Sequence, residues 1–559
     1  MGRDATEHIP ATGISRRTML KGAGLIGAGA ACASLLGVGK AHAASESAEN
    51  VEPEWADTTD LLVIGTGCGI VCGVGAKQEG FDCILLEKDP QWWGGSTFLS
   101  GGGMWMPGNY PGKEAAPQEY KDRMDVDTLL TFMKGGLYRG ITPFGEGMEE
   151  YMFTNMPKAH DACVTRWGLP WVTPFPVHDY QKIDGWGGYR VAWVGEGWAA
   201  TREVIDAMDL DIRYGITATK LLMEDGRVVG VRAKDADGNV LNYKANNVVV
   251  AAGPFDRNPD MVNAFMRVPL DGSVVSEGCT GDGIRMCMEL GADLANMTHF
   301  IAAPCVLPSK DHEGMYGNIT EIDAGSARMF PHSLCVNDFG VRVCNESTTY
   351  TSFGDVMTGT YDKCGIPKSN RRLTFICDSQ YVDHYGLPKA GTGYVTQVNM
   401  DYVRKYDTLE ALCEAEGIDI ERFMEQLERY NGFCDDGVDR DFGRGESGWD
   451  DVTHPDSLAG SGFVPAIKEA EPDLKNPMLG RVEKAPFYAM TYGVGSYSTN
   501  GGMRVNVNNQ VTRDGEPIPG LYAVGVNAAM NYFTGGMAIG WGVWGAVNTL
   551  NHAYNLDLF

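Results

Sequence analysis

The first residues in this sequence whose spacing could do chemistry form a glycine-rich turn between two apolar runs. Leu61–Ile64 leads directly into Gly65, Gly67 and Gly69, and a second apolar run further along ends at Glu87. This order predicts a strand, a turn, a helix and a second strand, the βαβ unit that binds a dinucleotide. The pyrophosphate would lie on the helix N-terminus, where free N–H groups and the helix dipole favour negative charge. The carboxylate that ends the second strand is placed to accept hydrogen bonds from a ribose.

The glycine pattern departs from the usual fingerprint at its third position. Gly65 permits the tight turn and Gly67 lets the backbone approach the pyrophosphate, but Ile70 stands where a third glycine is expected. Gly69 and Gly73 lie beside it in the sequence. We therefore expect slightly unusual packing between this helix and its strand.

A second cluster of glycine and hydroxyl residues follows directly after the predicted ribose-binding strand. An NAD domain has no use for such a loop there, whereas a flavoprotein chain must wrap the pyrophosphate and pass close beneath the isoalloxazine. We therefore predict FAD as the cofactor, bound non-covalently. The residues of this loop are Gly94, Gly95, Ser96, Thr97, Ser100, Gly101, Gly102 and Gly103.

The run EKDPQWWGGSTFLSGGGMWMP resembles the flavoprotein family of soluble fumarate reductases and 3-ketosteroid Δ1-dehydrogenases, and SGGGMWMP is most similar to the ketosteroid side. The resemblance covers nearly the whole chain after about residue 57. It implies an α/β fold, in which a doubly wound, Rossmann-like FAD-binding domain with a β-meander carries an inserted α+β catalytic cap domain. NVVVAAGPF also resembles the family's VVLATGGF, and TGDG matches a family motif. The resemblance implies these further FAD-binding residues: Lys88, Ala252, Gly253, Asp282, Gly525 and Ile539.

Two positions separate the branches of this family. In VNDFGVRVCNESTTY, fumarate reductases place a catalytic arginine five residues after the asparagine at 345, ketosteroid dehydrogenases place a tyrosine there, and this chain has Tyr350. Near the C-terminus, NYFTGGMAIG is similar to the ketosteroid YAGPGATIG and lacks the arginine that holds a carboxylate. The histidine of the fumarate reductase HTMGG segment is replaced by Ser498. The residues that clamp a dicarboxylate are missing, so we expect a neutral, hydrophobic carbonyl substrate.

The resemblance also implies roles for individual residues. Tyr350 would exchange a proton with the carbon alpha to a carbonyl, and the flavin would exchange a hydride with the beta carbon. The Tyr532 hydroxyl and the Gly536 N–H would form the oxyanion hole. Ketosteroid dehydrogenases pair the first tyrosine with a second one on an N-terminal helix, where this chain has Phe132. Since an unpaired tyrosine has a pKa of about 10 and is a poor base at neutral pH, we favour reduction of an activated C=C over dehydrogenation.

Three alternatives stay open. The first is a 3-ketosteroid Δ1-dehydrogenase, which runs the same chemistry in reverse and passes electrons to a quinone or cytochrome. The second is a fumarate- or acrylate-type reductase, which would need a cationic carboxylate clamp. The third is a flavoprotein that transfers electrons without catalysis of its own, which Tyr350 and Tyr532 argue against.

The N-terminus predicts export. Arg16 and Arg17 precede an apolar stretch rich in glycine and alanine, and the sequence Ala-His-Ala follows at residues 41–43. This pattern is typical of a twin-arginine signal with its cleavage site. We expect the enzyme to pass the twin-arginine translocase and to work outside the cytoplasm, in the periplasm or at the membrane. No second dinucleotide fingerprint is visible for NAD(P)H, so we expect electrons from a membrane-bound cytochrome or a quinol.

The charge and the cysteine content of the chain limit the binding partners and metal sites that we expect. The formal net charge of -27 gives a surface that repels nucleic acid. The chain has 14 cysteines but no CxxC pair, so the common zinc and iron–sulfur spacings are absent and we predict no metal site. A cluster built from scattered cysteines stays open. Many free thiols in an exported protein suggest an anoxic habitat and anaerobic respiration.

Two domains must position the predicted cofactor-binding and catalytic residues. We expect residues 1–43 to be the signal peptide, 44–57 a linker, 58–298 the first part of the FAD-binding domain, 299–482 the cap and 483–559 the second part of the FAD-binding domain. Within the FAD-binding domain, Val240–Tyr243 reads as the last meander strand and Asn247–Phe255 as a separate buried strand. We expect a helix over Asp125–Arg139 and an amphipathic, charge-laced helical pair over Leu409–Tyr430 on the solvated surface of the cap. The terminal helix is expected to open at Ile539.

Overall fold

The computed structural model describes residues 54–115, 127, 148–176, 189–191, 198–308, 327–359, 370–388, 402–446, 450, 452–453, 463–529 and 535–559. The architecture below belongs to the unit Trp55–Phe559. The predicted signal peptide lies outside the described residues, as does nearly all of the helix predicted over Asp125–Arg139. Among the helices that are described, none is both long enough and apolar enough to cross a membrane.

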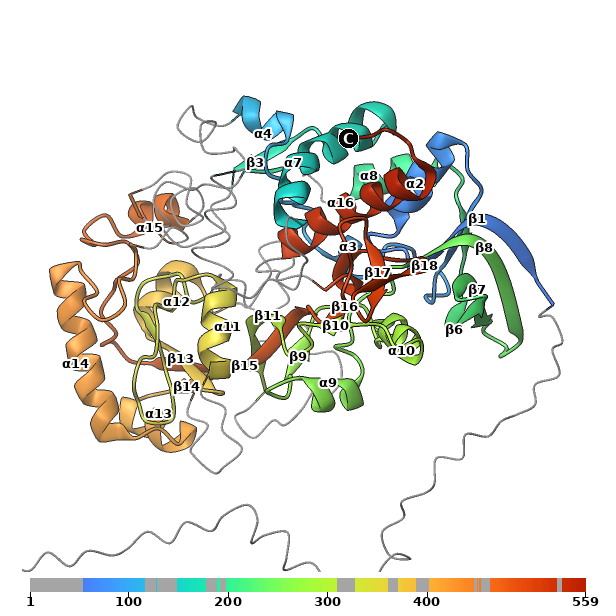
Figure 1. Cartoon of the computed structure of the whole chain (residues 1–559). Helices are drawn as coiled ribbons and strands as arrows, with labels where there is room; N and C mark the ends of the chain where they lie inside the picture. The colour runs from blue at the N-terminus through green and yellow to red at the C-terminus, as the bar shows by residue number, and fades with distance from the viewer. Residues whose placement is uncertain are drawn as a thin grey trace, which may run out of the picture. The chain divides into compact units, whose positions relative to one another are not determined.

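A sheet with a parallel core carries the glycine-rich turns (Figure 1). Its eight strands include the path β17-β18-β8-β1-β2-β5, in which β1 pairs in parallel with β2 and β8, β18 with β8, and β5 with β2. Crossover helices between parallel strands make this a Rossmann-like arrangement, and the predicted α/β class is confirmed. The strands are β1 (Asp57–Ile64), β2 (Cys83–Leu86), β5 (Asp211–Arg213), β8 (Val240–Val250), β17 (Gln510–Arg513) and β18 (Glu516–Ala523).

The β-meander is also present, but its last strand differs from the prediction. β6 (Thr217–Glu224) and β7 (Arg227–Lys234) form an antiparallel pair, and β7 pairs with β8. The two separate strands expected over 240–243 and 247–255 were wrong, because β8 is one continuous strand. Its first half pairs with β7 and its second half with β1 and β18, so both neighbours hold the backbone extended across the junction.

Helices pack closely on this sheet. α2 (Ile70–Glu79) follows the first glycine turn and lies against α16 (Gly535–Tyr554). An added Cβ at Gly75 would lie 2.7 Å from the Trp167 ring and would also meet Leu550 of α16, so a glycine is needed at this crossing. α16 begins at Gly535, earlier than the predicted start at Ile539. The other helices that accompany this sheet are α3 (Gly95–Leu99), α4 (Tyr110–Ala115), α7 (Met148–Asp161) with its π-helical continuation Ala162–Arg166, α8 (Ala199–Asp206), α9 (Pro259–Phe265) and α10 (Asp282–Glu289).

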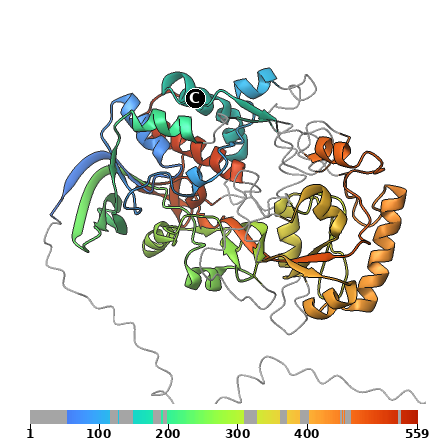
Figure 2. The same ribbon diagram turned by 180° about the vertical axis from the view of Figure 1, so that it is seen from behind.

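A second sheet, antiparallel except for the parallel pair of β9 with β15, is built around β15 (Figure 2). Its order is β11-β15-β13-β12, and β14 and β9 also pair with β15. β9 precedes residue 299 and β15 follows residue 482, so the sheet takes strands from all three predicted segments. The strands are β9 (Gly272–Ser273), β11 (Phe300–Leu307), β12 (Ser333–Val336), β13 (Leu373–Cys377), β14 (Arg404–Tyr406) and β15 (Phe487–Thr499), and the short pairs β3 (Pro174–Pro176) with β4 (Tyr189–Val191) and β10 (Leu294–Ala295) with β16 (Gly502–Met503) lie apart from it.

The helical pair predicted over Leu409–Tyr430 is confirmed and extends slightly further. α13 (Leu409–Glu416) and α14 (Ile420–Asp436) are each capped by the residue before them. The Thr408 and Asp419 side chains accept N–H bonds from the first turns, which satisfies donors that a helix leaves open. The remaining helices beside the second sheet are α11 (Tyr350–Gly359), α12 (Ser379–Tyr385) and α15 (Val464–Ala470).

Buried charges fix the loop that leads into α11. The Arg342 guanidinium is paired with the carboxylates of Glu346 (2.7 Å) and Asp439 (2.8 Å), and the side chains of all three are almost completely buried. Arg444, also fully buried, donates to the Ser347 hydroxyl (2.9 Å). Because buried ions are stable only when paired and hydrogen-bonded, these contacts determine the path of residues 342–349.

Removing one member of this network should destabilise the protein strongly. We expect Arg342→Leu to lower the free energy of unfolding by about 3–5 kcal/mol, because two buried carboxylates lose their partner. The matched control is Arg440→Leu, whose ion pair with Asp436 is exposed on both sides and should matter little. Chemical denaturation of both variants measures the difference, and equal midpoints would contradict this account.

Candidate active site

The loops predicted to bind a nucleotide lie together at one edge of the eight-stranded sheet. Parallel strands end at the same edge, and backbone hydrogen bonds join the turns that follow them. The Gly65 N–H donates to the Leu86 carbonyl of β2 (2.8 Å), the Ala251 N–H to the last residue of β1 (2.8 Å) and the Val524 N–H to the last residue of β8 (3.0 Å). The turns after β1, β2, β8 and β18 are therefore neighbours.

The first glycine turn is too tightly packed for side chains. Gly65 has a φ of +93°, and an added Cβ there would lie 2.8 Å from the Ala251 carbonyl carbon. At Gly69 an added Cβ would lie 2.8 Å from the Val63 side chain, and at Gly73 it would lie 2.8 Å from Leu85. The close approach of helix and strand is thus made at residues 69 and 73. This is how the chain accommodates an isoleucine at the third fingerprint position.

Glu87 closes the second strand, as predicted, and is held from two sides. Its Oε2 accepts bonds from the Thr66 hydroxyl and from the Thr66 N–H (3.2 Å), while Oε1 accepts from the Asp89 N–H (2.9 Å). The Thr66 hydroxyl oxygen in turn accepts from the Gly94 N–H (2.8 Å). The carboxylate therefore ties the first glycine turn to the second.

The second glycine loop folds over the first. An added Cβ at Gly67 would lie 3.1 Å from the Thr97 hydroxyl, so the two loops are in contact. Ser100 accepts from the Trp198 indole N–H (3.1 Å) and donates to the Thr97 carbonyl (2.6 Å). Gly94 and Gly95 both have positive φ, and the segment Gly101, Gly102 and Gly103 leads from this loop to Trp105.

This segment meets the start of α16. The Trp105 N–H donates to the Gly536 carbonyl (2.9 Å), and an added Cβ at Gly540 would collide with the Trp105 carbonyl. Cys68 of the first turn lies 4.0 Å from the Ile539 carbonyl. The first turn of α16 is thus joined to both glycine loops.

The loops after β8 and β18 form the rest of the nucleotide edge of the eight-stranded sheet. Asn527 donates its amide N–H to the Gly253 carbonyl (3.0 Å), and an added Cβ at Gly253 would lie 2.9 Å from the Cys279 sulfur. Ser96 lies 3.2 Å from that same sulfur. Gly525, with a φ of +60°, turns the chain after β18.

Lys88 and Asp282 form an ion pair beside this edge. The Lys88 ammonium lies 2.9 Å from the Asp282 carboxylate and donates to the Thr280 hydroxyl (2.8 Å). Burial alone would raise the pKa of Asp282, but the bonds from Lys88 and from Arg285 outweigh it, so the pKa lies below its usual value. The carboxylate at the N-terminus of α10 is therefore ionised at neutral pH.

These residues fit a bound FAD. Five of the glycines predicted to bind it stand where an added Cβ would meet neighbouring atoms at van der Waals contact or closer, which leaves a cradle of backbone without side chains: Gly65, Gly67, Gly69, Gly94 and Gly253. In addition, the buried Asn527 amide oxygen, which lies at the same edge, has no hydrogen-bond partner among the residues that the structure describes. A pyrophosphate and ribose need backbone contact and polar groups of this kind.

Tyr350, the predicted proton-exchanging residue, is the first residue of α11 and is 8 % exposed. Its ring lies against that of Tyr497 on β15, with ring centroids 4.7 Å apart and an interplanar angle of 45°. Sequence reasoning missed Tyr497, because nothing near it in the sequence marks it as a neighbour of α11. Phe132 stands where the family has a partner tyrosine, and this was an argument for reduction. Because Tyr497 lies beside Tyr350, that argument no longer applies.

Several predicted residues lie outside the described part of the chain. Tyr532 and the rest of residues 530–534 belong to this group, as does Phe132. Gly536 is described, and it lies in the first turn of α16 beside Trp105. Ala252 directly follows β8 at the nucleotide edge.

A carboxylate clamp of the fumarate reductase kind is not found at the positions that are described. Ser498 donates its hydroxyl to the Thr499 carbonyl (3.0 Å), and Tyr350 replaces the arginine. The described residues contain no group of histidine, cysteine and acidic side chains that could hold a metal ion. All twelve described cysteines are free thiols. Burial raises the pKa of Cys68 to about 11 and that of Cys287 to about 12, so these thiols stay protonated.

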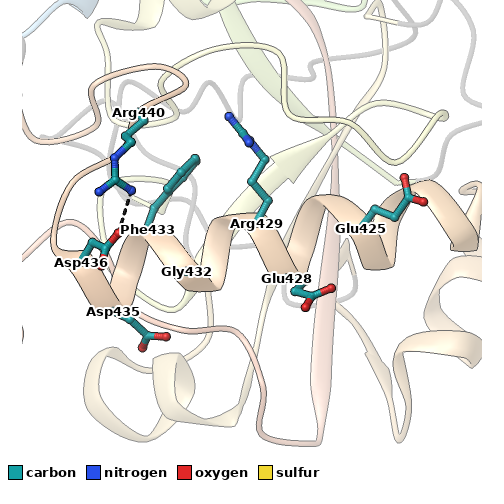
Figure 3. Close-up of a pocket in the computed structure, with 8 residues that line it drawn as sticks. All are labelled: Glu425, Glu428, Arg429, Gly432, Phe433, Asp435, Asp436 and Arg440. Carbon is teal, nitrogen blue, oxygen red and sulfur yellow. Dashed lines mark hydrogen bonds and ion pairs between the residues drawn. The ribbon is translucent and has the colours of Figure 1, made fainter.

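The groove shown in Figure 3 lies on the outer face of α14 and has a different character. Charged side chains of both signs line it, and Arg440 and Asp436 form an ion pair across one end (2.7 Å). This mixture is typical of a solvated surface and agrees with the charge-laced helical pair expected here. Its lining residues are Glu425, Glu428, Arg429, Gly432, Phe433, Asp435, Asp436 and Arg440.

Comparisons with known proteins agree with this geometry. A family model described as "FAD binding domain" matches residues 60–540. A 3-oxosteroid 1-dehydrogenase of Mycolicibacterium smegmatis is 28% identical over 83% of this chain and 91% of its own length. A 4-oxocyclohexanecarboxylate 2-dehydrogenase of Sinomonas cyclohexanicum is 26% identical over 86% and 89%. A digoxin reductase of Eggerthella lenta is 24% identical over 96% and 95%.

Solved structures show the same fold. The 3-ketosteroid Δ1-dehydrogenase of Sterolibacterium denitrificans, in complex with 1,4-androstadiene-3,17-dione, aligns with a TM-score of 0.72 at 21% identity and covers 89% of this chain and 99% of that one. A flavocytochrome c3 fumarate reductase aligns with a TM-score of 0.59 at 22% identity over 90% and 80%.

Filling the glycine cradle should weaken cofactor binding. An added Cβ at Gly69 must displace Val63 or Ala251, and overpacking of this kind costs about 1–3 kcal/mol, so we expect Gly69→Ala to lower FAD affinity by about 10- to 100-fold. Gly432→Ala is the control, since Gly432, like Gly69, does not have a positive φ but has no atom within 4 Å of an added Cβ. Titration of the apoprotein with FAD, followed by flavin fluorescence, measures both, and an unchanged affinity in Gly69→Ala would contradict the assigned site.

Proposed function

Because the chain belongs to the FAD binding domain family and is an FAD-dependent oxidoreductase of CH–CH or C=C bonds, we propose that it reduces an activated C=C next to the carbonyl of a hydrophobic, ketosteroid-like substrate. The family confirms the predicted cofactor, and non-covalent attachment is part of the proposal. When bound, FAD supplies the hydride chemistry at the beta carbon. The observation that carries the proposal is a buried tyrosine, Tyr350, at the position where fumarate reductases have an arginine.

In this proposal the protein's own residues handle the proton and the carbonyl. Tyr350 donates its phenolic proton to the alpha carbon. The Tyr532 hydroxyl and the Gly536 N–H donate to the carbonyl oxygen, where negative charge develops, and so lower the barrier. The sequence has no arginine at the family's clamp positions, which supports a neutral substrate over a dicarboxylate.

The names of the relatives support a cyclic ketone. Two dehydrogenases among them are named for an oxosteroid and for 4-oxocyclohexanecarboxylate, which are both cyclic ketones, although the second also carries a carboxylate. A digoxin reductase and a urocanate reductase of Eggerthella lenta, the latter 24% identical over 86% of this chain, are named for reductions. Both dehydrogenases and reductases occur among these names. We therefore base the proposed direction, reduction, on the expected source of electrons. We propose export by the twin-arginine pathway and electrons from a membrane cytochrome or quinol.

Dehydrogenation is the second candidate, and one observation favours it. A tyrosine next to a second phenol is a better base than a tyrosine alone, because the neighbouring hydroxyl can stabilise the phenolate. The contact between Tyr350 and Tyr497 provides such a neighbour. The residues involved are the same in both directions.

Anaerobic reoxidation of the flavin tests substrate and direction together. The holoenzyme is reduced with dithionite and mixed with 3-keto-4-ene steroids, simpler enones or fumarate. We expect rapid reoxidation by a neutral enone and none by fumarate. Reoxidation by fumarate alone would refute the substrate class. Bleaching of the oxidised flavin by a saturated ketosteroid, without enone turnover, would establish dehydrogenation.

Tyr350→Phe should slow the enone-dependent step by about 10²–10⁴-fold, the usual contribution of a positioned acid or base. Reduction of the flavin by dithionite should not change, because the phenol takes no part in it. Stopped-flow absorbance at the flavin band measures both rates. Full activity in Tyr350→Phe would mean that another group donates the proton.

Tyr532→Phe should lower the rate by about 10²–10³-fold, since one donor to the developing oxyanion is lost. Steady-state kinetics with the enone identified above should place most of this loss in kcat. A change confined to KM would mean that the hydroxyl only binds the ground state.

A further inference from the structure

We propose that Tyr497 is the proton-relay partner of Tyr350, returning a proton to its phenolate after each transfer to substrate. This inference rests on the proposed function, because it concerns the same proton. Tyr350 is 8 % exposed, so its proton cannot be replaced directly from bulk water. Tyr497 is half-buried and touches the Tyr350 ring, which makes it the more accessible member of the pair.

A β-bulge supplies the first structural argument. β11 and β15 pair Ile301 with Ser498 and then Ala302 with Ser496, so Tyr497 is the extra residue on β15. A bulge breaks the regular alternation of side chains and redirects the extra residue, and bulges are common next to active sites. In a regular strand, Tyr497 would point to the face opposite to that of Ser496 and Ser498. At the bulge this alternation is broken, and the Tyr497 ring lies against the Tyr350 ring.

A buried carboxylate holds the bulge on both sides. Asp256, which is fully buried, accepts from the Ser496 hydroxyl (2.6 Å) and from the Thr499 N–H (2.8 Å). The Phe255 N–H donates to the Thr499 hydroxyl (3.0 Å). Residues 255–256 follow the nucleotide-edge loop after β8, so the bulge is fixed relative to the cofactor site and Tyr497 with it.

Gly354 allows α11, the helix that carries Tyr350, to approach the bulge closely. An added Cβ at Gly354 would lie 2.6 Å from the Ala302 carbonyl carbon and 2.6 Å from the Ala303 nitrogen. α11 therefore rests directly on the β11 backbone beside the bulge. Tyr350 lies one turn earlier on the same helix, which is why its ring reaches Tyr497.

The proton balance of the relay is simple. Tyr350 gives its phenolic proton to the alpha carbon and becomes a phenolate. The Tyr497 hydroxyl then donates its proton to that phenolate oxygen, and water returns a proton to Tyr497. No electron moves in these steps, and in the dehydrogenation direction the same protons move the opposite way.

Tyr497→Phe tests the relay, since it keeps the ring and removes only the hydroxyl. We expect multiple-turnover reduction of the enone to slow by about 10- to 100-fold. A small proton donor such as imidazolium in the buffer should restore much of the rate by replacing the hydroxyl, an effect that a purely structural role would not produce. Tyr488→Phe is the matched control, because it removes a hydroxyl from another half-buried tyrosine on β15 and should change nothing.

The outcomes separate the two proposals. If Tyr497→Phe keeps the full rate while Tyr350→Phe is slow, the relay is wrong and the proposed function stands. If Tyr350→Phe also keeps the full rate, the proposed role of Tyr350 is wrong as well. A slow Tyr497→Phe that imidazolium does not rescue overturns the relay in favour of ring packing. Should this variant lose FAD, Tyr497→His takes its place, because an imidazole also carries an exchangeable proton. A rate near that of the wild-type enzyme supports the relay, and a slow variant that retains FAD overturns it.

Discussion

The buried carboxylate of Asp256 is the interaction on which the arrangement of this molecule depends. It accepts the hydroxyls of Ser273 (3.0 Å) and Ser496 (2.6 Å) and the Thr499 N–H (2.8 Å), from β9 and β15 of the second sheet. Asp256 itself belongs to the loop after β8 of the first sheet. A carboxylate out of contact with water is stable only with such donors, so the loop and both strands must keep their places together. The nucleotide edge and the strand that carries Tyr497 are thereby joined.

On the side of α11, buried arginine side chains fix the position of the chain. Arg328 is fully buried, donates to the Thr348 carbonyl (2.6 Å) and lies over the Phe353 ring at 4.8 Å. It thus contacts the chain on both sides of Tyr350. Arg342 and Arg444 hold the preceding residues. The buried contacts of the VNDFGVRVCNE motif therefore fix the loop that leads to Tyr350.

Much of the fold could be predicted because its signals are local. The turn at Gly65, the end of the second strand at Glu87 and the helical pair α13 and α14 depend on residues within a few positions, and each was predicted. β8 was divided wrongly, because Asn246 and Asn247 look like a break until both neighbouring strands are known. α16 starts earlier than expected because the Trp105 N–H holds the Gly536 carbonyl in a stretch with poor helix propensity. Tyr497 could not be found, since its orientation is set by the register of β11, a distant strand.

The free thiols have a consequence for where this protein can exist. Disulfide exchange and oxidation both require a thiolate, and burial raises the pKa of Cys344 and of Cys434 to about 12. The fold is complete without a covalent cross-link among the described cysteines. The described cysteines are buried or half-buried thiols, so this part of the fold needs no disulfide to hold it together in either a reducing or an oxidising medium.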